Sequence, residues 1–500
     1  MGLVSVSAKT MSLAIFNKNA AKNYLLHSLS GLPGISQKIF QQLSMRLDHN
    51  DCVPLEPLSV EKIRSEIERS HPKLFAQIRS LDEVGKIASI GQVHRAVLND
   101  GREVAIKVKL PNIDQEIWEN FRLIRKAAPF APGKKYGMQI HSFLDSLENV
   151  LREELDYQLE AKNQHEFRRC LAKFPQFVVP EVIDSLSNDC ILTQAFELSV
   201  SPSEVKYRWQ AAEKRYCAEL LFTFGVQSLF NQHLLHGDFH AGNFGFRKKN
   251  TASTAEIQMV LYDFGAVLRL EKSAPGILIC LIDAYGSGRH VSPFNALCSI
   301  GFDPEKLKHI AACLPALCET IFEPFLTDLP WRPGDWDLQL RIDRLLGENK
   351  WWFRSAGPPW FLQLMRSMAG VLFSMKDMDA AVFSRKILLT HLDASVDYSS
   401  VRIEDYSKYL ENQPNYNCTN SAKNLTVLVT ENTEEVVSLS MPARAVDDLE
   451  ELIPGDKVEK IKAGGIDFEE IKVKAQRSGY MPQTLFEAQV DIRRYLVRLV

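Results

Sequence analysis

The 500-residue sequence contains no Cys-x-x-Cys pair, and its nine cysteines are scattered singly along the chain. Their number is odd, and no secretory hydrophobic segment precedes them. This pattern predicts free thiols in a reducing compartment, and it excludes a disulfide framework and a zinc cluster. Cys313 and Cys318 are accordingly interpreted as ordinary buried thiols.

No apolar run approaches the roughly 18 to 20 residues that a membrane-spanning helix needs. The nearest, GILICLIDAY from Gly276, is interrupted by Asp283 and is predicted to be a buried core helix. We therefore expect no transmembrane segment and, at most, a peripheral contact with a membrane.

The chain also lacks a charge excess, since the formal net charge is −3. This balance gives no overall attraction to nucleic acid, so no nucleic-acid partner is expected. Residues 1–47 contain no acid, which raises three interpretations: a transit peptide, a basic helix on a membrane surface, or a helical segment that packs on its own protein. We adopt the last. The short N-terminus favours the bacterial cytoplasm, with a mitochondrial location as the alternative.

No internal repeat or low-complexity tract is present, and the pattern of apolar and polar residues changes along the sequence. VHRAVL and EVAIKVK flank Asn-Asp-Gly, which predicts a β-hairpin. Residues 114–171 have helical periodicity, 176–198 predict two strands, and 266–411 are expected to be almost wholly helical. Residues 411–424 resemble a linker. They precede a small ββα-type module with a helix at ARAVDDLEELI and a terminal strand.

The segment LLHGDFHAGNFGFRKKNTASTAEIQMVLYDFG, residues 234–265, concentrates the polar side chains that suggest chemistry. NFGF and IQMVLYD predict a hairpin that brings Asn243 and Asp263 together. An Asp five residues before an Asn, then a hairpin and Asp-Phe-Gly, is typical of protein-kinase-like folds. Asp238 would orient the acceptor or water, and Asn243 and Asp263 would hold Mg²⁺, which prefers oxygen ligands.

A zinc site at His236, Asp238 and His240 is the competing interpretation, because alternation places all three on one side of an extended chain. It leaves Asn243 and the Asp-Phe-Gly motif unexplained. Phosphate and magnesium account for the whole segment.

A kinase-like site also needs a lysine on a strand and a glutamate on a helix. VAIKVK supplies Lys107, whose ammonium can reach nucleotide phosphates. REELDYQLEAKNQHEF is predicted as one helix with Glu153, Glu154, Asp156 and Glu160; the last two share a face and Glu154 points elsewhere. A solvated acidic face is the alternative for this helix.

A Gly-x-Gly-x-x-Gly loop is missing before Lys107. Instead ASIGQVHRAVLNDGREVAIKVKLP, EELDYQLEAKNQHEF, HGDFHAGN and LYDFGA together resemble the UbiB/aarF/ADCK family of atypical kinases, over about residues 25–400. The resemblance implies an α+β, protein-kinase-like, two-lobed fold, with ATP and Mg²⁺ as cofactors. Glu160 matches the glutamate that pairs with the strand lysine.

The resemblance also assigns two further elements. An alanine-rich loop replaces the glycine-rich one and would bind nucleotide; its positions here are Lys86, Ile87, Ala88 and Ser89. A regulatory lid joins a KxGQ helix to an ExD motif; Lys38 and Gln41 match the first, with Phe40 in place of glycine, and Glu154 and Asp156 match the second. The departures at Phe40 and Lys86 put the family's usual regulation in question.

The resulting domain prediction has five parts. They are an N-terminal helical extension (1–75), a β-containing N-lobe (76–198), a helical C-lobe (199–410), a linker (411–424) and a small accessory α+β domain (425–500).

The resemblance implies an ATPase or small-molecule kinase that supports ubiquinone or other isoprenoid-lipid biosynthesis, with phenolic or isoprenoid lipid precursors as ligands. Two alternatives remain open. One is a nucleotide-gated lipid-binding or scaffold protein with little turnover, and the other is a small-molecule phosphotransferase of the aminoglycoside or choline kinase type. The aromatic stretch 351–373, with Arg354 and Arg366, could suit a lipid pocket, but we interpret it as core of the helical lobe.

Overall fold

The computed structural model describes the chain from residue 57 to residue 500, except for residues 89, 128–144, 146–147, 150, 251–254, 393–400, 411–421, 423, 432–433, 478–479 and 481–482. The predicted lid residues Lys38 and Gln41, together with Phe40 and Ser89, lie outside the described residues.

Contacts divide the chain into two compact units. The first comprises residues 1–220, 234–269 and 363–378, and the second comprises residues 221–233, 270–362 and 379–500. The domain boundaries given above remain predictions. Every described residue of the predicted site belongs to the first unit.

The first unit contains a five-stranded antiparallel sheet in the order β1-β3-β4-β6, with β2 paired to β3. Its strands are β1 (Ile78–Leu81), β2 (Lys86–Ile87), β3 (Gly91–Leu98), β4 (Glu103–Lys109) and β6 (Ile191–Ala195). The hairpin predicted around Asn-Asp-Gly is therefore confirmed as β3–β4. Gly101 in its turn has φ +89°, a conformation that other residues rarely adopt.

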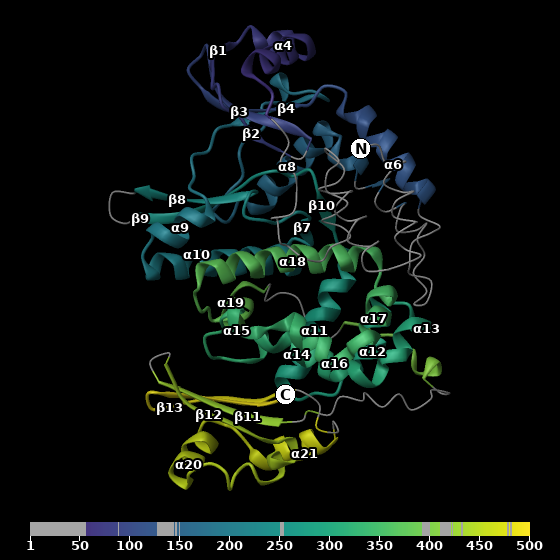
Figure 1. Cartoon of the computed structure of the whole chain (residues 1–500), viewed down its shortest axis with the longest axis vertical. Coiled ribbons are helices and arrows are strands. Elements are labelled where there is room, and N and C mark those ends of the chain that lie inside the picture. The colour runs from purple at the N-terminus through teal and green to yellow at the C-terminus, as the bar shows by residue number, and fades with distance from the viewer. Residues whose placement is uncertain are drawn as a thin grey trace, which may run out of the picture. The chain divides into compact units, whose positions relative to one another are not determined.

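Alternation along β4 decides which side chains face the site. Val104, Ile106 and Val108 are fully buried and pack in one core with Ile63 and Ile67 of α4 (Val60–Ser70). Because successive strand residues point to opposite faces, Lys107 lies on the face away from this core. Figure 1 shows α4 beside β4.

Two short antiparallel strand pairs frame the polar segment of residues 234–265. β7 (Leu234–His236) pairs with β10 (Val267–Arg269), and β8 (Phe244–Asn250) pairs with β9 (Ala255–Leu261). Phe244 lies opposite Leu261, so Asn243 and Asp263 flank the same end of the β8–β9 hairpin, as the sequence predicted. β5 (Phe177–Val178) adds a parallel strand to β9.

The helices of this unit supply the rest of the site. They are α4, α5 (Pro72–Phe75), α6 (Ile113–Ala127), α8 (Tyr157–Leu171), α9 (Pro202–Arg208), the first part of α10 (Ala211–Val226), and most of α18 (Pro359–Met378). The site uses two of them, α8 and α18.

The second unit is mainly helical in the part that precedes its C-terminal module. Its helices are α11 (Ser273–Ser287), α12 (Pro293–Ser299), α13 (Pro304–Leu307), α14 (Leu314–Leu326), α15 (Pro333–Trp336), α16 (Leu338–Leu346), α17 (Lys350–Ala356) and α19 (Ser384–His391). The predicted core helix from Gly276 is confirmed as part of α11, whose residues from Ala274 to Ile282 are all buried.

One helical run, Pro304–Leu326, is long and apolar enough by length and composition to cross a membrane. The expectation that no run reaches that length was therefore wrong by this criterion. The sequence does not show this run as one continuous apolar stretch, because the charged residues Glu305, Lys306 and Lys308 lie near its beginning. Half of its apolar window is buried, and its second part, α14, packs against α11 and α16.

The cysteines correct a second expectation. Cys170, Cys190, Cys217, Cys280, Cys298 and Cys318 are free, as predicted. Cys313, in contrast, takes part in a disulfide bond, so the prediction of a free thiol was wrong at this position. Spacing in the sequence does not reveal such a bond, because the fold decides which cysteines approach within bonding distance.

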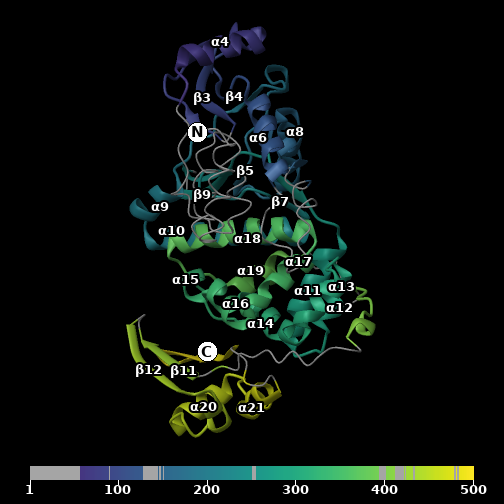
Figure 2. The same cartoon turned by 45° about the vertical axis from the view of Figure 1, so that its right-hand side comes forward.

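A four-stranded sheet with two helices ends the chain, within the second unit. The antiparallel sheet has the order β12-β11-β14-β13, and its strands are β11 (Asn424–Glu431), β12 (Glu434–Pro442), β13 (Gln483–Val490) and β14 (Arg493–Leu499). Figure 2 shows α20 (Gly455–Ala463) and α21 (Phe468–Arg477) on one face of this sheet. The helix predicted at ARAVDDLEELI is present only in part, since Ala443–Asp448 is a 3₁₀ helix. The α-helix α20 begins at Gly455, after its N-cap residue Pro454.

Candidate functional site

Lys107 of β4 forms the central ion pair of the site. Its Nζ lies 2.9 Å from Oε1 and 2.8 Å from Oε2 of Glu160, which belongs to α8. The same Nζ lies 3.4 Å from Oδ2 of Asp263. Only 10% of the Lys107 side chain and 2% of the Glu160 side chain are exposed. The three charges are therefore brought together in a low-dielectric setting, where they interact more strongly than at a surface.

Burial and neighbouring charge compete at this pair. Burial lowers the pKa of Lys107, but Asp263 and Glu160 outweigh it and hold that pKa well above its usual value. Burial raises the pKa of Glu160 to about 7; Lys107 opposes this shift and Asp263 reinforces it. Lys107 is thus a cation throughout the physiological range, whereas Glu160 titrates near neutrality.

We expect the Glu160 carboxyl to make folding stability depend on pH. Its pKa rises from 4.5 to about 7 on folding, so the folded state binds the proton more tightly than the unfolded state does. The stability of the wild type relative to Glu160→Gln should be greatest below pH 4.5 and fall, by on the order of 3 kcal/mol, as the pH rises to about 7. Urea unfolding of both proteins from pH 4 to pH 8 measures this difference. A constant difference, or one that grows with pH, would contradict the assignment.

Glu154 and Asp156 are placed differently from the prediction. They do not lie on one helix with Glu160, because the helix breaks at Leu155 and Asp156. Asp156 is the exposed N-cap of α8, and its Oδ1 accepts a hydrogen bond from the Leu159 amide at 2.9 Å. Aspartate is among the favoured N-cap residues, which explains why α8 begins here.

This break turns Glu154 inward, so the expectation that it points elsewhere was wrong. Glu154 is 6% exposed. A Cβ placed on Gly265 would lie 3.8 Å from a carboxylate oxygen of both Glu154 and Glu160. The two glutamates therefore converge on the Asp-Phe-Gly turn, while Asp156 faces away from α8's buried side.

The Asp-Phe-Gly turn holds Asp263 in an uncommon backbone conformation. Asp263 has φ +54°, in the left-handed region. The Gly265 amide donates a hydrogen bond to its Oδ1 at 3.2 Å, while Oδ2 faces Lys107. Phe264 is fully buried and packs on the rings of Phe167 and His236, at centroid distances of 5.0 and 5.6 Å. The buried ring thus anchors the turn that presents the Asp263 carboxylate.

The loop before β8 carries Asp238 and Asn243. The Asn243 side-chain nitrogen donates to the Asp238 carbonyl at 3.0 Å, and the Tyr262 amide donates to the Asn243 carbonyl at 2.7 Å. The first bond commits the amide nitrogen, so the amide oxygen is the atom that can meet a cation. With the Asp263 carboxylate, this gives the hard oxygen donors that suit Mg²⁺, which usually takes few protein ligands and completes its shell with water and phosphate. The residues fit the predicted ion.

The zinc alternative does not fit. His236 is buried, its Nε2 donates to the Tyr262 carbonyl at 3.0 Å, and its Nδ1 accepts from the Asp238 amide at 3.3 Å. Both ring nitrogens are thus used by the backbone. Among the described residues no group of three His, Cys, Asp or Glu side chains could hold a metal ion.

Helix α18 contributes side chains that the sequence interpretation assigned to the core of the helical lobe and not to this site. Arg366 donates to Oδ1 of Asp238 at 2.6 Å, and Ser367 donates to the His236 carbonyl at 2.8 Å. One turn further, a Cβ on Gly370 would collide with the Phe239 carbonyl oxygen. The RSMAG sequence thus places α18 directly on the Asp238 loop. A cation followed by small residues at i+1 and i+4 indicates a helix face that packs closely against another segment. The sequence does not reveal which loop that segment is.

Of the loop assigned to nucleotide binding, Lys86 and Ile87 form strand β2, which pairs with β3. Lys86 pairs with Val93, Ile87 pairs with Gln92, and the Ala88 amide donates to the Gly91 carbonyl at 2.9 Å. Lys86 Nζ donates to the Gly242 carbonyl at 3.2 Å, next to Asn243. Lys86 therefore brings a positive charge beside the predicted magnesium ligand.

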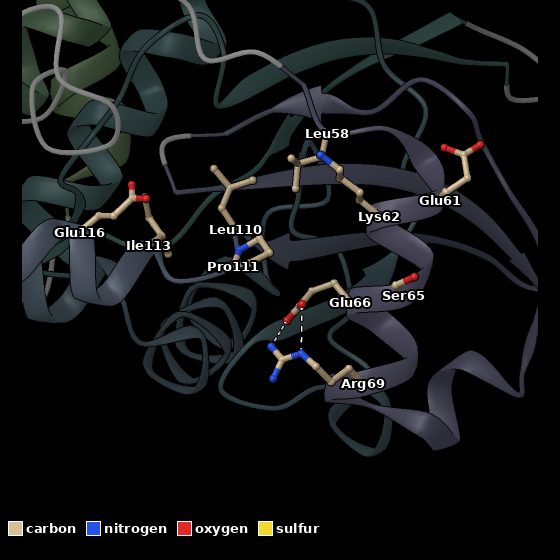
Figure 3. A pocket seen from close by; sticks show the side chains of 10 residues that line it. All are labelled: Leu58, Glu61, Lys62, Ser65, Glu66, Arg69, Leu110, Pro111, Ile113 and Glu116. Atoms are coloured by element: carbon tan, nitrogen blue, oxygen red, sulfur yellow. Dashed lines mark hydrogen bonds and ion pairs between the residues drawn. The ribbon is translucent and has the colours of Figure 1, made fainter.

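A cavity of about 580 Å³ lies elsewhere in the first unit, between α4 and the segment that follows β4. Figure 3 shows its mixed lining, in which Glu66 is paired with Arg69. None of the predicted site residues lines it.

The antiparallel sheet that carries Lys107, the helix that carries Glu160 and the β8–β9 hairpin that Asn243 and Asp263 flank define a protein-kinase-like α+β fold. Residues 50–285 match the ABC1 atypical kinase-like domain. The predicted resemblance is confirmed: this part of the chain is a kinase-like domain of the UbiB/aarF/ADCK family, with the two-lobed fold that the sequence predicted.

Individual proteins similar to this chain carry names of the same family. The chain is 30% identical to "Atypical kinase coq-8, mitochondrial" from Caenorhabditis elegans over 215 residues, which are 43% of this chain and 28% of that protein. It is 27% identical to "Probable protein kinase UbiB" from Cellvibrio japonicus over 251 residues, 48% of this chain and 44% of that protein. The matches therefore span less than half of either relative.

A solved structure supports the fold alone. The Rv3197–erythromycin complex from Mycobacterium tuberculosis superposes with a TM-score of 0.51 at 22% identity, and the match covers 77% of this chain and 97% of that one.

Proposed function

We propose that this chain binds ATP with magnesium and acts as an ATPase or small-molecule kinase in ubiquinone or other isoprenoid-lipid biosynthesis. The observation that carries the proposal is the approach of Lys107 Nζ to both Glu160, at 2.8 Å, and Asp263, at 3.4 Å. Such a lysine, fixed by a buried glutamate, suits the binding of nucleotide phosphates. The relatives' names, UbiB and coq-8, support the lipid pathway.

In this proposal each side chain has one task. Lys107 contacts phosphate, and Glu160 keeps Lys107 in place. Asn243 and Asp263 hold magnesium, which neutralises phosphate charge when bound. Asp238 orients the attacking water or hydroxyl, and the turn from Lys86 to Ser89 covers the nucleotide. Glu154 and Asp156 belong to the lid with Lys38 and Gln41.

A nucleotide-gated binding protein with little turnover is the second candidate. One observation favours it: Oδ1 of Asp238 accepts a hydrogen bond from Arg366 at 2.6 Å, so an acceptor hydroxyl would compete with this cation at that oxygen. In that case ATP occupancy would shift the conformation and hydrolysis would be incidental.

The test is ATP hydrolysis by the purified protein with magnesium or with EDTA, alone and with phenolic isoprenoid-precursor mimics or anionic lipid vesicles. We expect magnesium-dependent turnover that rises with these additions. Magnesium-dependent binding without turnover in every condition would favour the second candidate. Absence of ATP binding would refute both.

A further inference from the structure

Helix α8 directs a row of buried side chains toward the Asp-Phe-Gly turn. Glu160, Asn163 and Phe167 are 2%, 2% and 1% exposed. Their spacing of three and four residues places them on one face of the helix. Glu160 pairs with Lys107, and Phe167 packs on the Phe264 ring. Asn163, which lies between them, has no task in the proposed function.

The Asn163 amide joins α8 to both ends of one short segment. Its Nδ2 donates to the Phe264 carbonyl at 2.9 Å, and its Oδ1 accepts from the Arg269 guanidinium at 2.8 Å. Arg269 is held in turn by Glu166 of the same helix, with its Nε 3.2 Å from Oε2. Because a guanidinium can only donate, Arg269 fixes the amide oxygen on its own side and directs Nδ2 to Phe264.

The bond from Asn163 fixes the backbone beside the predicted magnesium ligand. Asp263 has φ +54°, a conformation that persists where surrounding contacts hold it. The Phe264 carbonyl and the Gly265 amide belong to one planar peptide unit, so they turn together. The Gly265 amide donates to Oδ1 of Asp263 at 3.2 Å. By holding the carbonyl, Asn163 therefore also holds the amide that orients the Asp263 carboxylate.

We propose that Asn163 is a positioning residue that orients Asp263 for magnesium. The inference rests on the proposed function, in which Asp263 is a magnesium ligand. Without the bond from Asn163, the peptide unit is free to turn, and the Gly265 amide no longer stays on Oδ1. The carboxylate must then be ordered by the ion itself, and the entropy lost in that ordering weakens binding.

Asn163→Leu tests this role, since leucine has a similar size and no hydrogen-bonding group in its side chain. We expect the magnesium concentration for half-maximal ATP binding to rise by about tenfold or more. The KM for ATP at saturating magnesium should change much less, because Lys107 keeps its pair with Glu160. Binding of Mn²⁺ together with ADP, followed by electron paramagnetic resonance, measures the same loss of affinity without turnover.

Gln164→Met is the matched control. Gln164 is the next residue of α8, is 1% exposed, and donates from Nε2 to the Pro180 carbonyl at 2.8 Å. This variant also removes a buried bond to a backbone carbonyl, but that carbonyl lies outside the Asp-Phe-Gly turn. Urea unfolding should show that both variants are less stable than the wild type, whereas Gln164→Met should keep the wild-type dependence on magnesium.

Arg269→Met provides a second test. The Arg269 side chain is 50% exposed, so its replacement should leave the fold intact. It removes the donor that orients the Asn163 amide, and we expect a smaller shift in the same direction as for Asn163→Leu.

Two outcomes would overturn the inference: a wild-type dependence on magnesium in Asn163→Leu, or an equal shift in Gln164→Met. If Asn163→Leu does not fold, Arg269→Met decides, and an unchanged dependence on magnesium in that variant overturns the inference as well. A wild type without any magnesium-dependent binding of ATP would instead refute the proposed function.

Discussion

Asp263→Asn should lower magnesium-dependent ATP turnover by at least about a hundredfold. The substitution removes the charged oxygen ligand that the proposed magnesium site needs, and it also removes a negative charge 3.4 Å from Lys107. Asparagine is the suitable replacement because Asp263 has φ +54°, and asparagine tolerates the left-handed region well. Turnover is measured as phosphate release over a range of magnesium concentrations.

The matched control is Asp379→Asn. Asp379 also has a positive φ, +47°, and its side chain is 79% exposed beside Arg332, in the second unit. This variant should keep wild-type turnover. If Asp263→Asn retained full activity, or if both variants lost it equally, the assignment of Asp263 as a magnesium ligand would fail.

Gly370→Ala should disrupt the contact between α18 and the Asp238 loop. The added methyl group would overlap the Phe239 carbonyl oxygen, so either the helix or the loop must move. Overpacking of this kind lowers the free energy of unfolding by about 3 kcal/mol. Because Arg366 and Ser367 lie on the same part of the helix, their bonds to Asp238 and His236 should weaken as well. Urea unfolding and ATP turnover should both report the change.

Gly334→Ala serves as the control for helical glycine. Gly334 lies in α15, and a Cβ there would meet no atom within 4 Å. This substitution should be neutral or slightly stabilising, since alanine reduces the freedom of the unfolded chain. Equal stability of Gly370→Ala and the wild type would show that α18 is not held against the loop as described.

The local elements of the site follow from short stretches of sequence. Alternating apolar residues around Asn-Asp-Gly determine the β3–β4 hairpin, and the same alternation places Lys107 on the face opposite Val104 and Ile106. The short strands before and after residues 251–254 likewise predict that Asn243 and Asp263 lie at one end of a hairpin. These predictions succeed because hairpin register depends on residues close together in the chain.

Other features depend on contacts between distant segments, and the sequence did not predict them. The helix breaks before α8, where Asp156 is the N-cap, and Glu154 lies near the Asp-Phe-Gly turn, whereas the periodicity of the sequence predicts one continuous helix. The disulfide of Cys313 is equally invisible to spacing.

By itself, the sequence determined the kinase-like class of this chain and the residues Lys107, Glu160, Asp238, Asn243 and Asp263 as its candidate site. Only the tertiary structure decided that Arg366, 128 residues beyond Asp238, pairs with the carboxylate of Asp238. The physical reason is that residue types and local periodicity specify strands, turns and helices, whereas the packing of α18 through Gly370 selects which distant charges meet.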